Sequence, residues 1–449
     1  ANSLRQPDSQ DPGGLDRAAF EADPRQPGPS ALQFNTRKTV NQDQAGLRLQ
    51  HRLGGSTSLE AIGYAGQRDV LQFLGFRGDF GLSSGGVVDL DRGYAGGALR
   101  VSTGEALRIS AGVEYDRMDE RRKGFVNEDG TVGALRRDED DVVSSTDLYL
   151  QGEWRFAERW RAHGGLRASR VQFRSTDYFI VGANPDDSGS RDYSASTPVV
   201  GILFKARENI SLYGNLGRGF ETPTFAELAH SSTGSGLNFG LDAARSRHAE
   251  LGVKALLRRL GRVNAALFDI RTKDEIVVDT SGGGRTVFKN AARTSRRGLE
   301  LAAETLAPGP WDLQLAYTWL QAEFSEGFTA GTTPIPAGNL IPGVPKSQAY
   351  AQLRYRRPGY FVALEGIYRS RVAVNDVNGE FADAFGVLNL VGGLSQAGQG
   401  WRLSEFLRID NLGDKRYAGS VIVNDGNGRY YEPAPGRTVT LGIQARIEL

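Results

Sequence analysis

Residues 107–116 read LRISAGVEYD, and along this stretch apolar side chains alternate with polar or small ones. The apolar members are Leu107, Ile109, Ala111, Val113 and Tyr115. A β-strand turns successive side chains to opposite faces, so the stretch predicts a strand with one apolar face and one strongly polar face. Strands of this kind form the wall of a membrane-spanning barrel, in which one face meets lipid and the other faces a polar interior.

The same alternation recurs from about residue 42 to the end of the chain, as in residues 311–319 (WDLQLAYTW) and 439–449 (VTLGIQARIEL). Runs of about 9–11 such residues are long enough to cross a bilayer. A soluble β-sandwich or propeller also alternates, but strand length and the repeated Arg and Glu of the polar face favour the barrel. We therefore expect an all-β fold, a transmembrane antiparallel β-barrel.

The connections between these strands are of two kinds. Tight turns at residues 157–159, 207–209 and 356–359 alternate with long polar loops. The long loops are expected at about residues 119–142, 175–192, 220–245, 326–346 and 413–436. Short turns at one end and long loops at the other are typical of bacterial barrels, with the long loops extracellular.

Composition excludes several classes of function. The 449 residues include no Cys, which removes disulfide frameworks, thiol nucleophiles and Cys-ligated zinc. A formal net charge of +1 favours neither nucleic acid nor a strongly acidic partner. No stretch approaches the roughly 18 apolar residues of a transmembrane helix.

The strand count raises a question of parity. We count about 17 full strands, with starts that include residues 42, 285 and 437, and single-chain bacterial barrels have an even number. Either residues 1–6 form an eighteenth strand or upstream strands are missing, and we expect missing strands. The predicted division is a strand stub and extracellular loop in residues 1–41 and the barrel in residues 42–449.

Four motifs, all from residue 215 onward, resemble those of TonB-dependent outer-membrane receptors. Residues 215–228 (NLGRGFETPTFAEL) are similar to the "GFxxPTxxEL" segment of that family, and residues 410–417 (DNLGDKRY) to its "NLFDKRY" signature. Phe288-Lys289-Asn290-Ala291 with Arg297-Gly298-Leu299-Glu300 resembles a family strand, and residues 435–437 resemble its "PGR". Gly413 stands where the family usually has an aromatic residue, and the chain ends in Leu449 where a terminal aromatic is common.

The resemblance covers the whole chain and implies more than the pattern does. Family barrels have 22 strands around an N-terminal plug, so this chain would hold about 17–18 of a 22-stranded barrel, with the plug domain absent. The implied location is the bacterial cell outer membrane. The implied partners are outer-membrane lipid, a small-molecule ligand and TonB of the inner-membrane energising complex, reached through a plug not present in this chain. We expect a monomer that binds no nucleic acid.

The resemblance also implies a class of solute. Iron-siderophore uptake is the default of the wider family. The loops around Thr222-Pro223-Thr224 and residues 424–433 most resemble a branch that includes receptors for pyrroloquinoline quinone. The expected function is therefore import of a scarce, bulky solute, either an iron-siderophore or a cofactor of that kind.

Five residues are candidates for binding this solute: Arg218, Glu221, Phe225, Arg293 and Arg296. The first three follow a predicted strand where it leaves the membrane, and a guanidinium pairs bidentately with carboxylates. The alternative is that Arg218 and Glu221 are lumen charges that pair with a plug or with adjacent strands. For Arg293, Arg296 and Arg297 the alternative is that they line a solvated lumen.

No catalytic or metal-binding set appears. His51, His163, His230 and His248 are scattered without the spacing of metal ligands, and no motif joins a Ser, a His and an Asp. We expect no enzyme activity, no metal site and no bound cofactor. Two functions remain open: energised uptake that needs a plug, and passive conduction through a plugless outer-membrane pore.

Overall fold

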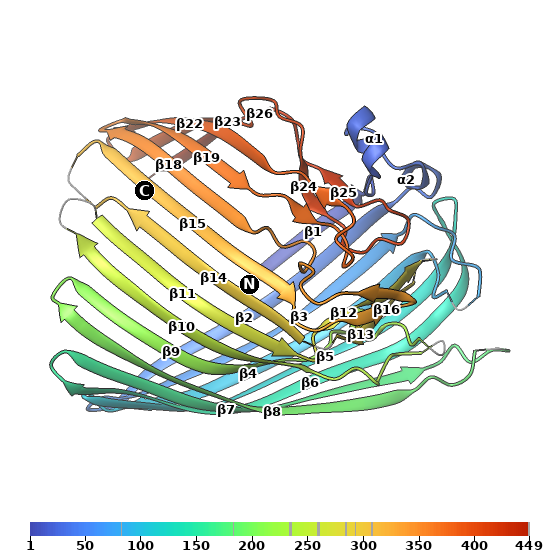
Figure 1. The fold of residues 1–449 in the computed structure, drawn as a ribbon, viewed down its shortest axis with the longest axis horizontal. Coiled ribbons are helices and arrows are strands. Elements are labelled where there is room, and N and C mark those ends of the chain that lie inside the picture. Colours follow the sequence, from blue (N-terminus) through green and yellow to red (C-terminus); the bar gives the residue numbers. More distant parts are fainter. Residues whose placement is uncertain are drawn as a thin grey trace.

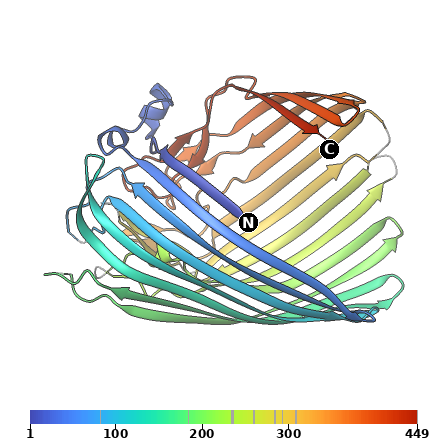
Figure 2. The same cartoon turned by 180° about the vertical axis from the view of Figure 1, so that it is seen from behind.

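The structure is a computed structural model that describes residues 1–81, 83–182, 184–232, 236–257, 261–282, 285–291, 293–306 and 309–447. Over these ranges, eighteen strands form one strongly curved antiparallel sheet (Figures 1 and 2). In spatial order they are β1 (Asn2–Gln10), β2 (Arg37–Gly54), β3 (Thr57–Phe73), β4 (Val87–Thr103), β5 (Leu107–Glu128), β6 (Thr131–Ala157), β7 (Trp160–Asp177), β8 (Gly189–Arg207), β9 (Ile210–Glu221), β10 (Ala244–Leu257), β11 (Gly261–Lys273), β14 (Arg293–Glu304), β15 (Trp311–Phe324), β18 (Ser347–Arg357), β19 (Tyr360–Arg369), β22 (Phe385–Gly398), β23 (Trp401–Asp410) and β26 (Thr438–Ile447). The predicted all-β barrel sheet of about 17–18 strands is confirmed.

The two edges of the sheet are β1 and β26. Within the described residues, β1 pairs only with β2, and β26 pairs only with β23. Asn2 lies opposite Gln44, so the part of β2 from Ala45 to Gly54 has a strand partner on one side only in the described chain. The division at residue 41 and the expected absence of a plug stay predictions.

Two predicted boundaries are wrong. Residues 119–142 were expected to be a long loop, but β5 and β6 extend through them to a tight turn at Asp129-Gly130, where both residues have positive φ. Residues near 285 were expected to start a barrel strand, but they form β13 (Arg285–Asn290), which pairs with β12 (Ile276–Gly282) in a loop hairpin. The barrel strand of this region is β14, which starts at Arg293.

The two faces of the sheet differ as the alternation predicts. On β6, Leu148 and Leu150 are 58% and 56% exposed, whereas Asp147, which precedes them on the opposite face, is 6% exposed. Asp147 is held by Arg167 of β7, with 2.9 Å between Nε and the carboxylate. Curvature crowds side chains on the concave face, so the polar, buried face is the inner one and the apolar face is directed outward. Charged pairs of this kind line the inside of the sheet.

Small elements gather in the long connections at one end of the sheet (Figure 1). In the part of the chain that the structure describes, these are β12–β13, the pairs β16 (Phe328–Ala330) with β17 (Thr333–Ile335), β20 (Val372–Ala373) with β21 (Phe381–Ala382), and β24 (Ala418–Val421) with β25 (Tyr431–Pro433), and the helices α1 (Arg17–Ala22), α2 (Pro29–Gln33) and α3 (Phe225–Leu228). None of the described helices is both long and apolar enough to cross a bilayer. This end, with its packed loops, carries the candidate site.

Candidate functional site

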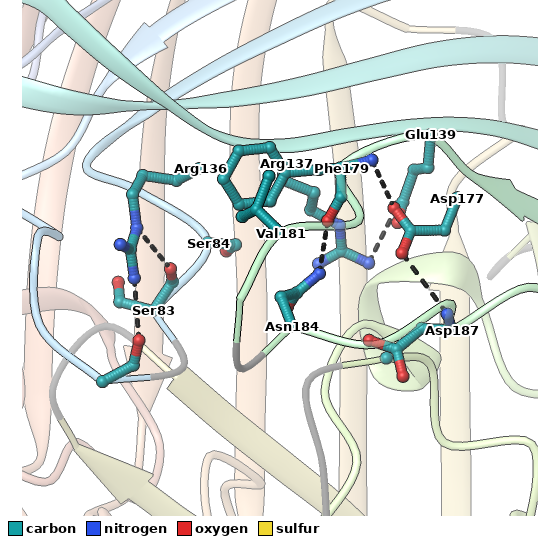
Figure 3. A pocket seen from close by; sticks show the side chains of 12 residues that line it. Ser83, Ser84, Arg136, Arg137, Glu139, Asp177, Phe179, Val181, Asn184 and Asp187 are labelled. Carbon is teal, nitrogen blue, oxygen red and sulfur yellow. Dashed lines mark hydrogen bonds and ion pairs between the residues drawn. The ribbon is translucent and has the colours of Figure 1, made fainter.

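A pocket of about 190 Å³ lies where the β3–β4, β7–β8 and β9–β10 connections meet the upper part of β6 (Figure 3). Its wall on the β6 side is Arg136, Arg137 and Glu139. Arg136 donates to the carbonyl oxygens of Gly81 at 2.7 Å and Ser83 at 3.3 Å, which fixes the β3–β4 connection. The volume is below the roughly 300 Å³ at which small-molecule sites begin, so the pocket can hold part of a ligand only.

The opposite wall of the pocket belongs to the β7–β8 connection. The carboxylate of Asp177 accepts from the backbone N–H of Phe179 at 2.9 Å and of Asp187 at 3.3 Å (Figure 3). The side chain of Asn184 donates to the carbonyl of Phe179 at 2.6 Å. Hydrogen bonds from side chains to the backbone take the place of strand pairing in this connection, so it has a defined shape without regular secondary structure.

Behind the pocket, β5 and β6 bury a cluster of charges on the inner face. Arg122 lies opposite Glu139, and Glu120 lies opposite Asp141. Glu139 is 2.7 Å from Arg137, although the two groups are not aligned as a hydrogen bond. Burial and then the neighbouring Glu139 raise the pKa of Asp141 to about 8. Burial acts in the same direction on Glu139, but Arg137 and Arg122 outweigh it and its pKa lies below the usual value.

His230 in the β9–β10 connection completes this cluster. Burial first, and then the charges of Arg137, Arg285 and Arg122, lower the pKa of His230 to about 3. Arg137 donates to the carbonyl of Ala229 at 3.1 Å, and Arg285 donates to the carbonyl of Ser231 at 3.0 Å, so both arginines hold the backbone on either side of the histidine.

The local sequence explains why His230 is held there. Thr224 begins α3 as its N-cap and forms a capping box with Glu227, whose carboxylate accepts from the N–H of Thr224 at 2.7 Å. Phe225 and Leu228 are buried, and the ring of Phe225 packs edge-on against Phe173 of β7 with 5.0 Å between ring centroids. The helix is therefore fixed at both its polar and its apolar side.

Near neutral pH this arrangement has an excess of positive charge. Arg122, Arg137 and Arg285 are cationic, and Glu139 is an ionised carboxylate beside Arg137 and Arg122. A pKa of about 8 keeps Asp141 protonated, and a pKa of about 3 keeps His230 neutral. Glu120 is paired with Arg92 and adds no net charge. Guanidinium groups therefore outnumber ionised carboxylates within the cluster, whereas the pocket in front of it is also lined by the carboxylates of Asp177 and Asp187. No three described His, Cys, Asp or Glu side chains lie together as metal ligands would.

The structure places the five predicted residues at different sites. Arg218 points to the outer face of the sheet, since it shares the parity of exposed Leu216 on β9. Arg293 starts β14 on that same outer face and pairs with Glu326 at 3.2 Å. Arg296 faces inward and binds Glu275 through two nitrogens, at 2.8 and 3.0 Å.

The remaining two predicted residues lie beyond the strands or at their end. Glu221 is the last residue of β9 and is exposed, whereas Phe225 is only 9% exposed within the α3 cluster. Solute binding by the five stays a prediction. The expectation that Arg293 and Arg297 line the lumen is wrong, because alternation along β14 directs Arg296 inward and its two odd-numbered neighbours outward.

Sequence reasoning missed Arg137, Glu139 and Asp141, which lie in the run RRDEDD at residues 136–141. The predicted long loop at residues 119–142 includes that run. A signal was present: Asp129-Gly130 is a hairpin dipeptide, and the run ERRK at residues 120–123 stands at hairpin distance from the acidic one. Opposite charges on facing strands support such pairing.

The chain matches known proteins at several levels. The family model described as "TonB dependent receptor-like, beta-barrel" matches residues 2–412. The chain is 26% identical over 306 residues to the "Metal-pseudopaline receptor CntO" of Pseudomonas aeruginosa, and 23% identical over 324 residues to the "Probable TonB-dependent siderophore receptor PiuA" of Acinetobacter baumannii. These alignments cover 65% and 69% of the chain but 38% and 41% of the relatives, so the chain spans about two fifths of their length.

Solved structures share the fold. The ferric citrate transporter FecA in its unliganded form superposes with a TM-score of 0.75 at 18% identity, over 97% of this chain and 65% of that one. The siderophore receptor PiuA from Acinetobacter baumannii superposes with a TM-score of 0.73 at 18% identity, over 92% and 65%. The matching family consists of outer-membrane receptors and transporters and not of enzymes. Because the family model matches residues 2–412, which is most of the chain, the chain belongs to the β-barrel family of TonB-dependent receptors.

Proposed function

We propose that this chain is the barrel wall of an outer-membrane receptor that imports an anionic metal chelate of the siderophore type. The observation that carries the proposal is the cluster of Arg122, Arg137 and Arg285 around His230, in which Arg137 and Arg285 bind the backbone on either side of the histidine. Chelators that bind metals through carboxylate or catecholate oxygens are anionic, and guanidinium groups bind such oxygens with two donors.

The outward face supports a place in the membrane. Large apolar side chains are exposed along it on most strands, for example Leu47 at 77%, Leu251 at 68% and Leu441 at 71%. A soluble monomer rarely exposes a contiguous apolar surface of this extent, whereas lipid covers it without cost. With this band in the bilayer, the long connections project to one side, and the pocket lined by Arg137 lies on that side with the buried charged cluster behind it.

The names of the relatives support the solute class. One is a receptor for a metal–pseudopaline complex, and another is named as a siderophore receptor. Pyrroloquinoline quinone, an aromatic carboxylate, is the second solute that the loop resemblance favours, and it also is an anion. The two solutes differ in metal content, so they can be distinguished directly.

Import against a gradient needs energy. We propose that TonB supplies it through a plug encoded outside these residues, and that the receptor acts as a monomer. The alternative is a plugless pore that conducts passively. The two differ in whether uptake stops when the energising complex is removed.

The test uses cells that produce the whole receptor from its own gene. Uptake of radioactive iron is measured with a catecholate, a hydroxamate and a hydroxycarboxylate chelator, and uptake of pyrroloquinoline quinone is measured beside them, with and without TonB. Saturable uptake of one ferric chelate that stops without TonB supports the proposal. Uptake of the quinone alone identifies the other solute, and uptake that persists without TonB identifies a pore.

A matched pair of variants tests the cluster itself. Arg285→Gln removes one cation beside His230 and is expected to weaken binding of the ferric chelate by about tenfold, as loss of a charge-assisted bond of 1–2 kcal/mol does. Arg262→Gln removes a cation from the short-turn end, where Arg262 pairs with Glu304 at 2.7 Å, and should leave binding unchanged. Equal binding by both variants would show that the cluster takes no part.

A further inference from the structure

The outer face of β9, β10, β11 and β14 carries a dense group of cations at the long-loop end. Its seven members, here called the outer basic patch, are Arg218, Arg245, Arg247, Arg271, Lys273, Arg293 and Arg297. All seven are exposed. Several of them line a groove of about 580 Å³ that also includes Phe220.

Strand register brings these residues together. Arg218 lies opposite Arg247, and Arg247 lies opposite Arg271, so three arginines form one row across three strands. The next row toward the loops places Arg245 opposite Phe220 on one side and Lys273 on the other. Paired side chains in adjacent strands are about 5 Å apart, which is the spacing at which two cations can share one anionic group.

On the same strands, the residues that alternate with those of the patch point inward, so the patch itself points outward. Ser246 and His248 of β10 share a hydrogen bond of 2.7 Å, and a side chain added at Gly219 of β9 would meet both. The odd-numbered residues of β10 and the even-numbered residues of β9 therefore point away from the interior. The outer basic patch has no access to a solute inside the barrel.

The patch continues directly into the apolar band. Leu216 of β9 lies two residues from Arg218 toward the short-turn end and is 59% exposed. Leu267 of β11 lies four residues from Arg271 in the same direction and is also 59% exposed. On β14, Leu301 lies four residues below Arg297 and is 42% exposed. The same outward face thus changes from apolar to cationic within one or two side-chain steps, as at the boundary between acyl chains and headgroups.

The patch has more positive charge than its own carboxylates neutralise. Asp269 binds two of its arginines, Arg271 at 3.0 Å and Arg297 at 2.9 Å. Among the described residues, Arg218, Arg247 and Lys273 form neither an ion pair nor a side-chain hydrogen bond. Three cations without partners, side by side on an exposed surface, repel one another unless an anion lies between them.

On the outer faces of β4, β5 and β6, at the same long-loop end of the sheet, positive and negative side chains balance each other. On the outer face of β5 and β6, Arg121 pairs with Asp138 at 2.7 Å and with Asp140 at 3.0 Å. On the outer face of β4, Asp89 and Asp91 add negative charge opposite the basic residues of β5. An excess of cations is therefore a property of the β9–β14 face, not of the whole rim.

We propose that the outer basic patch binds the phosphorylated headgroup of a lipid in the outer leaflet, with the acyl chains lying on the apolar rows below. The inference rests on the membrane placement given under the proposed function. Guanidinium groups bind phosphate oxygens with two donors, and basic residues at a membrane surface bind anionic headgroups additively. The groove supplies width for a headgroup with more than one phosphate.

The experiment uses the whole receptor purified in detergent, with native mass spectrometry as the measure of bound lipid. The probe is a bisphosphorylated glucosamine-disaccharide lipid, compared with the same lipid after enzymatic removal of its phosphates and with inorganic phosphate alone. Arg247→Gln/Lys273→Gln removes two unpartnered cations of the patch. Lys123→Gln/Arg174→Gln, on the outer faces of β5 and β7, is the control with the same change in charge.

We expect the receptor to bind the phosphorylated lipid and to prefer it to the dephosphorylated one. The patch variant should bind it about 30-fold more weakly, since each cation at a lipid surface contributes a factor of about five, and the control should match the unmodified receptor. Equal binding of both lipids, equal weakening in both variants, or displacement of the lipid by an equal concentration of inorganic phosphate would each overturn the proposal.

Binding of the ferric chelate is measured on the same preparations to separate the two proposals. Retained chelate binding without phosphate-dependent lipid binding defeats the lipid site alone. Retained lipid selectivity without chelate binding defeats the receptor function alone.

Discussion

Leu15 and Tyr431 exchange two backbone hydrogen bonds, with N–O distances of 2.8 Å from Leu15 to Tyr431 and 2.9 Å in the reverse direction. This bridge joins the connection after β1 to the connection before β26, the two ends of the sheet order. Arg17 adds a bond of 2.6 Å to the Tyr431 hydroxyl, and Phe20 stacks on its ring at 5.3 Å. Although β1 and β26 do not pair with each other in the described chain, the connections that flank them are held together here.

Tyr431→Phe should loosen this bridge. The Tyr431 hydroxyl donates to Glu380 at 2.5 Å, and burial followed by this bond raises the pKa of Tyr431. Loss of one buried, charge-assisted bond costs about 1–2 kcal/mol, or a factor of about 5–30 in an opening equilibrium. Amide hydrogen exchange across residues 11–36 should become faster by that factor. Tyr430→Phe is the control, and equal exchange in the two variants would contradict the role of the hydroxyl.

Gly14→Ala should disturb the same contact through shape alone. A methyl group at residue 14 would lie 2.3 Å from the carbonyl oxygen of Arg429 and 2.7 Å from Ile422. Because one neighbour is backbone, the segment must move, and overpacking of this kind costs about 1–3 kcal/mol. Trypsin should then cleave after Arg25 faster than in Gly379→Ala, where the nearest atom is 3.8 Å away. Equal cleavage would mean that the segment adapts freely.

Period-2 alternation was enough to predict the strands that cross the apolar band. It failed beyond that band, toward the long loops, because residues 119–123 and 136–141 are charged on both faces of β5 and β6 and the contrast that marks a strand disappears. Orientation was within reach of the sequence: Arg218 follows Leu216 by two residues, so both belong to the outward face. The interpretation of Arg218 as a lumen residue overlooked this parity.

The site at the loop end was not predictable in the same way. Arg137 comes from a strand, His230 from one long connection and Arg285 from another, and their proximity depends on how the loops pack. Only the capping box of Thr224 and Glu227 marks a local structure that the sequence predicts. Alternation sets register within a sheet, but it carries no information about contacts between connections.

Asn127→Asp should free the tip of the β5–β6 hairpin. The Asn127 side chain is fully buried and donates to the carbonyls of Phe34 at 3.2 Å and Leu74 at 2.9 Å. Aspartate has the same shape but places a carboxylate against two carbonyl oxygens, at a cost of about 2–3 kcal/mol. Protease digestion of intact cells should cut the hairpin tip in this variant. Asn427→Asp, at an exposed position of the long β23–β26 connection, should resist digestion as the unmodified receptor does. An uncut Asn127→Asp tip would refute the prediction.

Asp141 and His230 give the loop-side cluster opposite dependences on pH. With a pKa of about 8, folded Asp141 keeps a proton that the unfolded segment releases above about pH 4, so its contribution to stability falls between about pH 4 and pH 8. With a pKa of about 3, folded His230 excludes a proton that the unfolded segment takes up below about pH 6.5. Its contribution is complete above about pH 6.5 and is lost toward pH 3.

Of these two groups, only Asp141 still changes its contribution to stability above about pH 6.5, so the variant Asp141→Asn isolates that contribution. Asparagine is neutral at every pH, and the fall in local stability between about pH 6.5 and pH 8 should vanish in this variant. Protection of residues 236–245 against hydrogen exchange, taken as the ratio of unmodified receptor to variant, should drop by up to about tenfold per pH unit in that window. Asp140→Asn, whose carboxylate points to the outer face and pairs with Arg121 at 3.0 Å, is the matched control and should give a flat ratio. A flat ratio for Asp141→Asn as well would mean that folded Asp141 carries no proton near neutral pH, and the cluster would then lose the positive excess on which binding of an anionic chelate depends.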